Sequence, residues 1–181
     1  MIDLFDIYKM ACEDIQSDIH EHLPTLVKYG RQVDHITEFG VRGGCSTVAW
    51  WYSAPKTLRC YDIAECNTHD VLMREVPGAD RFDYKFIQAN VLAVEIEETD
   101  LLFIDTYHAY IQLSRELALH GNKVRKYLIF HDTVTFGERG EDQRSPGLRA
   151  AIDDFVSENP CWSFEKVFTN NNGLLILQRD N

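Results

Sequence analysis

The segment Glu38-Phe-Gly-Val-Arg-Gly-Gly-Cys-Ser-Thr47 decides the fold of this chain of 181 residues. It continues a short run over 35–39 that predicts a strand, and it leads into a helix predicted over 46–52. The glycines at positions 40, 43 and 44 allow the backbone to turn sharply and to approach a ligand where a Cβ atom would collide. Ser46 adds a hydroxyl that can bind a ligand or cap the helix. A strand, a glycine-rich turn and a helix in this order indicate a ligand site.

An acidic residue follows at the distance that such a ligand site needs. Asp62 ends the next predicted strand, 57–62, and lies twenty-two residues after Gly40. A carboxylate there can accept hydrogen bonds from the hydroxyls of a ribose. Two other interpretations remain, a glycine turn beside a solvated aspartate and an NAD enzyme. The NAD enzyme is the weaker one because dinucleotide-binding dehydrogenases carry G-x-G-x-x-G, a spacing that Gly40-Val-Arg-Gly-Gly lacks.

Outward from this segment, the chain alternates between predicted strands and helices. We expect further strands over 82–88, 100–105, 127–132, 163–168 and 174–178, and helices over 2–20, 25–29, 70–75, 110–120 and 148–156. A long polar loop spans 133–147, and Asn170-Asn-Asn-Gly173 predicts a hairpin between the last two strands. The order predicts an α/β fold with helices on both faces of a mostly parallel sheet and one antiparallel strand from the C-terminal hairpin.

Composition and charge limit the classes of protein to which this chain can belong. With 45% hydrophobic and 26% charged residues, we expect a single domain over 1–181, made of a helical extension over 1–30 and a cofactor-binding and catalytic core over 31–181. The net charge of −11 opposes nucleic-acid binding. No apolar run approaches the length of a membrane span, and acids follow Met1 where an export signal would carry Lys or Arg, so we expect a cytoplasmic protein.

A second group of polar residues follows the fourth and fifth predicted strands. Asp105 and His108 stand three positions apart across a strand-to-helix turn, and His131 and Asp132 lie at the end of the neighbouring strand. Each alone has a simpler interpretation as a helix cap or an incidental histidine. Together they place two carboxylates and two imidazoles at one edge of the sheet. Carboxylates suit Mg²⁺ and imidazole also accepts softer divalent ions, so Asp105, His131 and Asp132 are candidate metal ligands.

The glycine turn and Asp62 together resemble the class I S-adenosylmethionine-dependent methyltransferases, whose first motif reads E/D-x-G-x-x-x-G. The resemblance covers about residues 30–181 and implies their Rossmann-like sheet, with S-adenosylmethionine as cofactor. It also implies a cofactor site whose parts come from several strand ends. In that site Glu38, Gly40 and Gly44 line the methionine part, Asp62 holds the ribose, and Ala89 and Asn90 lie near the adenine. Ser46 and Asp105 are further candidate cofactor-binding residues.

The D-x-x-H at 105–108 and the acid-Thr pair at 132–133 narrow this resemblance to the group of macrocin O-methyltransferase and cephalosporin hydroxylase. In sugar O-methyltransferases of that group, the Asp of D-x-x-H and a Glu-Asp pair bind Mg²⁺, and the His deprotonates the acceptor hydroxyl. The resemblance therefore implies Asp105 and His108 as catalytic residues, with His108 as a base of near-neutral pKa. The resemblance implies Mg²⁺ or another divalent cation, and His131, which stands where the group has Glu, leaves the identity of that metal open.

The same resemblance implies a partner of a particular kind, a small molecule that accepts a methyl group on a hydroxyl, similar to a sugar or a natural product. The tetrapeptide D/N-P-P-Y/F, typical of methylation of amino groups on bases or glutamine, is absent after the fourth strand, where Ile104-Asp-Thr-Tyr-His stands.

The N-terminal helices offer a surface for a homodimer. A different class of function remains open, a cofactor-binding or scaffolding protein of the same fold without methyl transfer.

Overall fold

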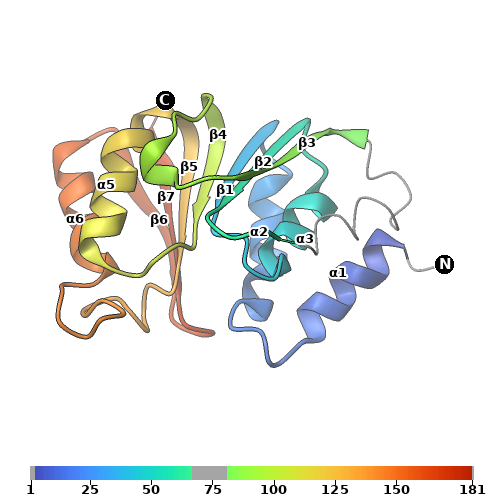
Figure 1. Ribbon diagram of the computed structural model, residues 1–181, viewed down its shortest axis with the longest axis horizontal. Helices are drawn as coiled ribbons and strands as arrows, with labels where there is room; N and C mark the ends of the chain where they lie inside the picture. The colour runs from blue at the N-terminus through green and yellow to red at the C-terminus, as the bar shows by residue number, and fades with distance from the viewer. Residues whose placement is uncertain (1–2, 67–80, 181) are drawn as a thin grey trace.

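The computed structural model describes residues 3–66 and 81–180, which contain one seven-stranded sheet (Figure 1). Its order is β3-β2-β1-β4-β5-β7-β6. The first five strands are parallel, and β7 runs antiparallel to both β5 and β6, which confirms the predicted mostly parallel sheet with a C-terminal hairpin. The strands are β1 (His35–Phe39), β2 (Thr57–Asp62), β3 (Asp83–Gln88), β4 (Thr99–Ile104), β5 (Val124–His131), β6 (Trp162–Phe168) and β7 (Leu174–Arg179).

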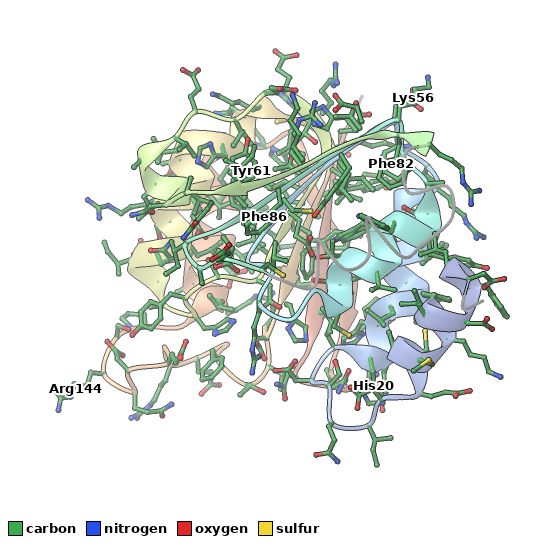
Figure 2. All side chains as sticks on the ribbon, turned by 45° about the vertical axis from the view of Figure 1, so that its right-hand side comes forward. His20, Lys56, Tyr61, Phe82, Phe86 and Arg144 are labelled. Carbon is green, nitrogen blue, oxygen red and sulfur yellow. The ribbon has the colours of Figure 1, made fainter. Side chains whose placement is uncertain are left out.

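Helices cover both faces of the sheet, as the sequence predicts (Figure 1), and side chains fill the space between these layers (Figure 2). One apolar core packs under α1 (Leu4–Glu13), α2 (Leu23–Gly30) and α3 (Cys45–Ser53), and the other under α5 (Tyr110–His120) and α6 (Leu148–Glu158). Single 3₁₀ turns link these elements at η1 (His20–His22), η3 (Val91–Ala93) and η4 (Gly121–Lys123). Among the described residues, no helix is both long and apolar enough to cross a membrane.

The N-terminal segment differs from its prediction. The helix expected over 2–20 ends at Glu13, because Asp14 starts a turn in which its carboxylate accepts from the backbone N–H of Gln16 at 3.1 Å and its carbonyl from that of Ser17 at 2.9 Å. Aspartate competes in this way with helical hydrogen bonding. Ile15, an apolar residue within the range of the predicted helix, is 79% exposed as a result. The helix expected over 70–75 lies outside the described residues.

A close approach between two strand ends forms the edge on which the site is built. The strand order changes direction between β1 and β4, which is where ligands bind in open α/β sheets. Gly40 has φ of +84°, and a Cβ added to it would lie 1.9 Å from the carbonyl oxygen of Asp105. The backbone N–H of Asp105 donates to Phe39 at 2.9 Å, and that of Gly40 donates to Tyr61 at 2.9 Å. Only glycine fits this contact.

A buried carboxylate fastens the helix after the turn to the central strands. Glu38, with no exposed surface, accepts hydrogen bonds from the hydroxyls of Ser46 at 2.6 Å and Thr47 at 2.7 Å, and from the thiol of Cys60 at 3.0 Å. Burial raises the pKa of Glu38 to about 7, although the three donors stabilise its ionised form. Glu38 thus joins β1, β2 and α3 beneath the glycine turn.

Replacing Gly40 tests how far the fold depends on that close approach. Gly40→Ala should lower the free energy of unfolding by at least about 2 kcal/mol, because the new Cβ meets the Asp105 carbonyl and the left-handed φ strains any L side chain. Gly43→Ala is the matched control, since a Cβ added at Gly43 would have nothing within 4 Å and its φ is not left-handed. Urea denaturation measures both variants. Equal stability losses would contradict the role given to Gly40.

Glu38 should make folding stability depend on pH. Its pKa in the folded protein, about 7, lies above the ordinary 4.5, so the folded state holds the proton more tightly and stability falls as pH rises from 4.5 through 7. Glu38→Gln removes this contribution, which amounts to about 3 kcal/mol across the interval. Urea denaturation at several pH values should show the variant gaining stability relative to the native protein as pH rises. The exposed Glu13→Gln is the control, and parallel profiles for Glu38→Gln and the native protein would refute the account.

Candidate functional site

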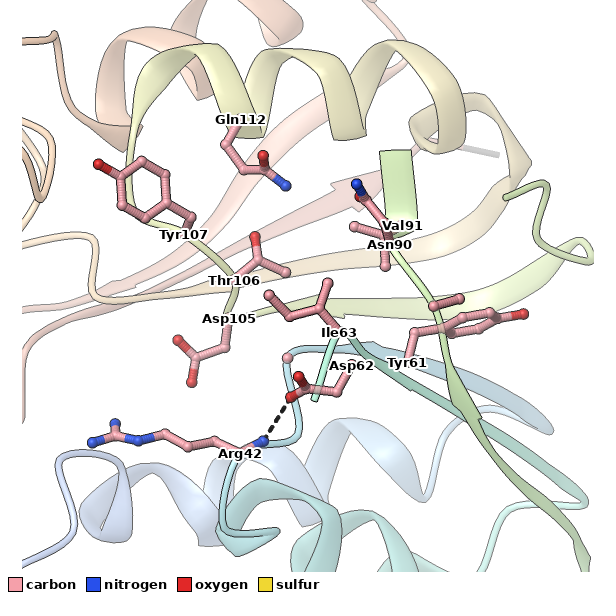
Figure 3. A pocket seen from close by; sticks show the side chains of 12 residues that line it. Arg42, Tyr61, Asp62, Ile63, Asn90, Val91, Asp105, Thr106, Tyr107 and Gln112 are labelled. Carbon is pink, nitrogen blue, oxygen red and sulfur yellow. Dashed lines mark hydrogen bonds between the residues drawn. The ribbon is translucent and has the colours of Figure 1, made fainter. Parts of the chain in front are cut away.

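A cavity of about 340 Å³ opens at the carboxyl ends of the parallel strands (Figure 3). This volume lies at the lower end of the range of small-molecule sites, about 300–1,000 Å³. Five of the residues that the sequence analysis assigned to the cofactor line it: Gly40, Asp62, Ala89, Asn90 and Asp105. They come from the ends of β1, β2, β3 and β4, so the fold gathers residues that are far apart in the chain.

The other three residues assigned to the cofactor lie outside this lining. Glu38 and Ser46 are buried and hydrogen-bond to one another beneath the turn, while Gly44 precedes α3 in a left-handed conformation, with φ of +78°. Their position gives Glu38 and Ser46 a supporting role. Direct contact of these three residues with a cofactor stays a prediction.

Asp62 holds the glycine turn in place at the edge of the cavity. One carboxylate oxygen accepts from the backbone N–H groups of Val41 at 2.8 Å and Arg42 at 2.9 Å, the second of which is drawn in Figure 3. The other oxygen accepts from the N–H of Ala64 at 2.8 Å. An ionised carboxylate has about four acceptor positions, so about one is left for a hydroxyl in the cavity.

Sequence reasoning missed several side chains that line the same cavity. Ile63 follows Asp62 directly and is 75% exposed, and an apolar residue next to a strand-end acid is a signal that could have identified it. Arg42, Thr106 and Tyr107 lie inside the motifs at 38–47 and 105–108. The other three have no local pattern, and only the fold brings them to the cavity: Tyr61, Val91 and Gln112.

The acid and imidazole groups predicted after β4 and β5 do converge, directly beside the cavity. The Nε2 atom of His108 lies 3.0 Å from a carboxylate oxygen of Asp132 and 3.2 Å from one of Asp105. The Nδ1 atom of His131 lies 3.5 Å from an oxygen of each carboxylate. Asp105 belongs to both groups, since its side chain lines the cavity as well.

His131 is held in an orientation that suits a metal ligand. Its Nε2 atom lies 3.0 Å from the carbonyl oxygen of Asp18 and 3.3 Å from that of Asn171. Because both partners only accept, Nε2 carries the proton, and the lone pair of a neutral His131 is then on Nδ1, facing Asp105 and Asp132. A ligand atom from each of these three residues lies within 4.8 Å of the others.

The donor set also fits a divalent cation chemically. Oδ1 of Asp132 is buried, and no hydrogen-bond partner reaches it among the described residues. Asp132 also has φ of +58°, a conformation that non-glycine residues adopt rarely and often at functional sites. Two carboxylate oxygens and one imidazole nitrogen are ligands for Mg²⁺ and for softer ions such as Mn²⁺.

The charges in this cluster differ from the expectation for His108. Burial alone would lower the pKa of both imidazoles, but the carboxylates of Asp105 and Asp132 outweigh burial and raise the pKa of His108 and of His131 to about 10. The two histidines in turn hold the pKa of Asp132 far below its usual range, against the effect of burial. His108 and His131 are therefore both cations at neutral pH in this state, and the near-neutral pKa expected from the sequence is wrong for His108. His131 would have to lose the proton on Nδ1 before that atom could bind a metal.

The polar loop over 133–147 folds against His108. Glu141 accepts at 3.0 Å from Nδ1 of that imidazole, and the backbone N–H of Glu141 donates to the carbonyl of His108 at 2.7 Å. The ring of Phe136 stacks on the imidazole with centroids 4.8 Å apart. Neither contact has a signal in the sequence, because both join residues about thirty positions apart.

Comparison with known proteins defines the fold. No protein-family model matches the sequence, and no curated protein matches it. The magnesium protoporphyrin IX methyltransferase of Synechocystis, solved with bound S-adenosylmethionine, has a TM-score of 0.67 at 12% identity over 90% of this chain and 82% of its own. A Klebsiella pneumoniae protein assigned as an O-methyltransferase gives 0.65 at 18% identity, over 100% and 91%. The N-methyltransferase NodS of Bradyrhizobium japonicum gives 0.64 at 14% identity, over 93% and 99%. The chain thus has the Rossmann-like fold of the S-adenosylmethionine-dependent methyltransferases.

Proposed function

We propose that this protein transfers the methyl group of S-adenosylmethionine to a hydroxyl of a small molecule, and that a divalent cation assists. The observation that carries the proposal is that Asp105 belongs to both the cavity and the acid–imidazole cluster. Its side chain lines the cavity formed by the strand ends and also contacts His108 in the acid–imidazole cluster. A cofactor in the cavity would therefore present its methyl group beside groups that can bind and deprotonate an acceptor.

The cavity supplies what the cofactor requires. The sulfonium methyl is already electrophilic, so the protein mainly has to align it with a nucleophile. Asp62 keeps one acceptor position for a ribose hydroxyl after securing the turn. Ala89 and Asn90 line the part of the cavity assigned to the adenine. The solved structure of the Synechocystis enzyme, which holds S-adenosylmethionine in the same fold, supports this choice of cofactor.

A cation would be held by Asp105, His131 and Asp132. Bound there, it would favour the deprotonated form of an acceptor hydroxyl, whose own pKa is far above neutral. His131 is already oriented for such a role, because the carbonyls of Asp18 and Asn171 hold its Nε2–H away from the cluster. The macrocin O-methyltransferase group remains a functional parallel, with His131 in place of its Glu.

His108 is the proposed base. It can accept a proton only when its imidazole is neutral, whereas the surrounding carboxylates now favour the charged form. Asp105 and Asp132 must therefore be engaged by other groups before His108 can act. Glu141 would then keep Nδ1–H in place and leave Nε2 to receive the proton.

Cofactor binding can be tested without knowing the acceptor. Isothermal calorimetry should detect S-adenosylmethionine and S-adenosylhomocysteine, and Asp62→Ala should weaken both by roughly 1–3 kcal/mol, about 5- to 150-fold, through the lost ribose contact. Glu65→Ala removes an exposed carboxylate three positions away and should leave affinity unchanged. Unfolding curves of both variants check that the overall fold survives the loss of the backbone contacts that Asp62 makes. Binding of NAD alone would exclude this function.

The chemistry is tested with labelled S-adenosylmethionine and a panel of hydroxylated small molecules, in the presence of Mg²⁺ or Mn²⁺. His108→Ala should transfer methyl at least about a hundredfold more slowly, while its affinity for the cofactor stays the same. Treatment with EDTA should abolish transfer, and added Mn²⁺ should restore it. Direct Mn²⁺ titration should show weaker binding to Asp132→Asn than to the native protein.

Three results would count against parts of this proposal. Full activity after EDTA would exclude the cation, and full activity of His108→Ala would exclude the base. Cofactor binding without transfer to any acceptor would favour a cofactor-binding protein that lacks chemistry.

A further inference from the structure

The strongest unused feature of the molecule is a buried carboxylate on α5. Glu116 has no exposed surface, although it lies on the helix that borders the cavity. Its Oε1 atom accepts from the hydroxyl of Thr106 at 2.7 Å and from Nε2 of Gln112 at 2.8 Å. Burial raises the pKa of Glu116 to about 7. Burying a carboxylate costs free energy that its hydrogen bonds offset only in part, so a buried carboxylate beside a cavity is a candidate for a specific role.

Both donors to Glu116 line the cavity assigned to the cofactor. Because Gln112 donates its Nε2 to Glu116, its amide has a defined orientation, and its carbonyl oxygen remains free to accept. Oε1 of Glu116 can accept in the ionised form and in the protonated form, in which the proton lies on the other oxygen. The hold on Gln112 therefore does not depend on the charge of Glu116.

A second amide in the cavity has the opposite orientation. The side-chain oxygen of Asn90 accepts from the backbone N–H of Leu92 at 2.9 Å, as the cap of η3, so its NH₂ group is left to donate. Figure 3 shows Asn90 and Gln112 on the same side of the cavity, across from Asp105 and Arg42. This side of the cavity thus offers one fixed acceptor and one fixed donor.

We propose that Glu116 is a positioning residue that fixes Gln112 as an acceptor, and that Gln112 and Asn90 together select adenine. The inference rests on the proposed function, since it assumes a nucleoside in the cavity. The edge of adenine presents an amino group that donates and a neighbouring ring nitrogen that accepts, which complements this pair of amides. Hypoxanthine, in which a carbonyl replaces the amino group and the adjacent ring nitrogen carries hydrogen, presents the reverse pattern. It would place acceptor against acceptor and donor against donor.

Calorimetry with S-adenosylhomocysteine and its hypoxanthine counterpart, S-inosylhomocysteine, tests the assignment. The native protein should bind the adenine ligand at least about tenfold more tightly. Gln112→Leu and Glu116→Leu should both reduce this preference to less than about threefold, because each removes or releases the acceptor. Glu116→Gln, whose amide oxygen can still accept from Gln112, should retain it. The exposed Ile111→Ala on the same helix should also retain it.

The outcomes separate this inference from the proposed function. If the native protein binds neither ligand, the proposed function itself is wrong. If it binds S-adenosylhomocysteine without preferring it, or if Gln112→Leu keeps the preference, the base selection proposed here is wrong. If Gln112→Leu loses the preference but folded Glu116→Leu keeps it, Glu116 has no positioning role. Should Glu116→Leu fail to fold, Glu116→Asp, whose shorter side chain draws the carboxylate away from Gln112, must lower the preference, and an unchanged preference would contradict the positioning role.

Discussion

The contact between Gly40 and the carbonyl oxygen of Asp105 is the constraint on which the rest of the site depends. It brings the turn after β1 against the end of β4 with no room for a side chain between them. The side chain of Asp105 is thereby placed at the border of two chemical environments, the cavity and the acid–imidazole cluster. A displacement of β1 relative to β4 would move the glycine turn, which forms one side of the cavity, away from Asp105.

Buried carboxylates recur around this contact, and each is satisfied in a different way. Glu38 is surrounded by hydroxyl and thiol donors, Asp132 by two imidazoles, and Glu116 by a hydroxyl and an amide. Uncompensated burial of a carboxylate strongly favours its neutral form. The histidines keep Asp132 ionised, whereas Glu38 and Glu116 have only neutral donors and titrate with a pKa near neutrality. The ionised carboxylate thus lies in the acid–imidazole cluster, where the chemistry is proposed, whereas Glu38 and Glu116, which support the cavity from beneath, carry less charge.

The sequence predicts the sheet well because β4 and β5 contain continuous apolar runs that are closely followed by acids, and because a glycine follows β1 directly. For the same reason, the residues at the strand ends could be assigned to one edge. The predicted range of the N-terminal helix is too long, because the apolar periodicity does not reveal the turn that Asp14 makes with Gln16 and Ser17. Glu141, Gln112 and Glu116 could not be assigned to the site, since their roles come from contacts that only the packed structure defines. The motif identifies Glu38 in the sequence, but it does not reveal that Glu38 is fully buried beneath the turn.

The segment that follows α1 meets the hairpin between β6 and β7 behind the acid–imidazole cluster. Asp18 and Asn171 each provide a carbonyl oxygen to Nε2 of His131, and the carbonyl oxygen of Asn170 lies 3.0 Å from Nε2 of His22. A shortened protein that began after the N-terminal helices would leave the buried N–H of His131 with one acceptor instead of two. The N-terminal extension is therefore a structural part of the proposed reaction centre. A truncated protein without it would not keep the acid–imidazole cluster intact.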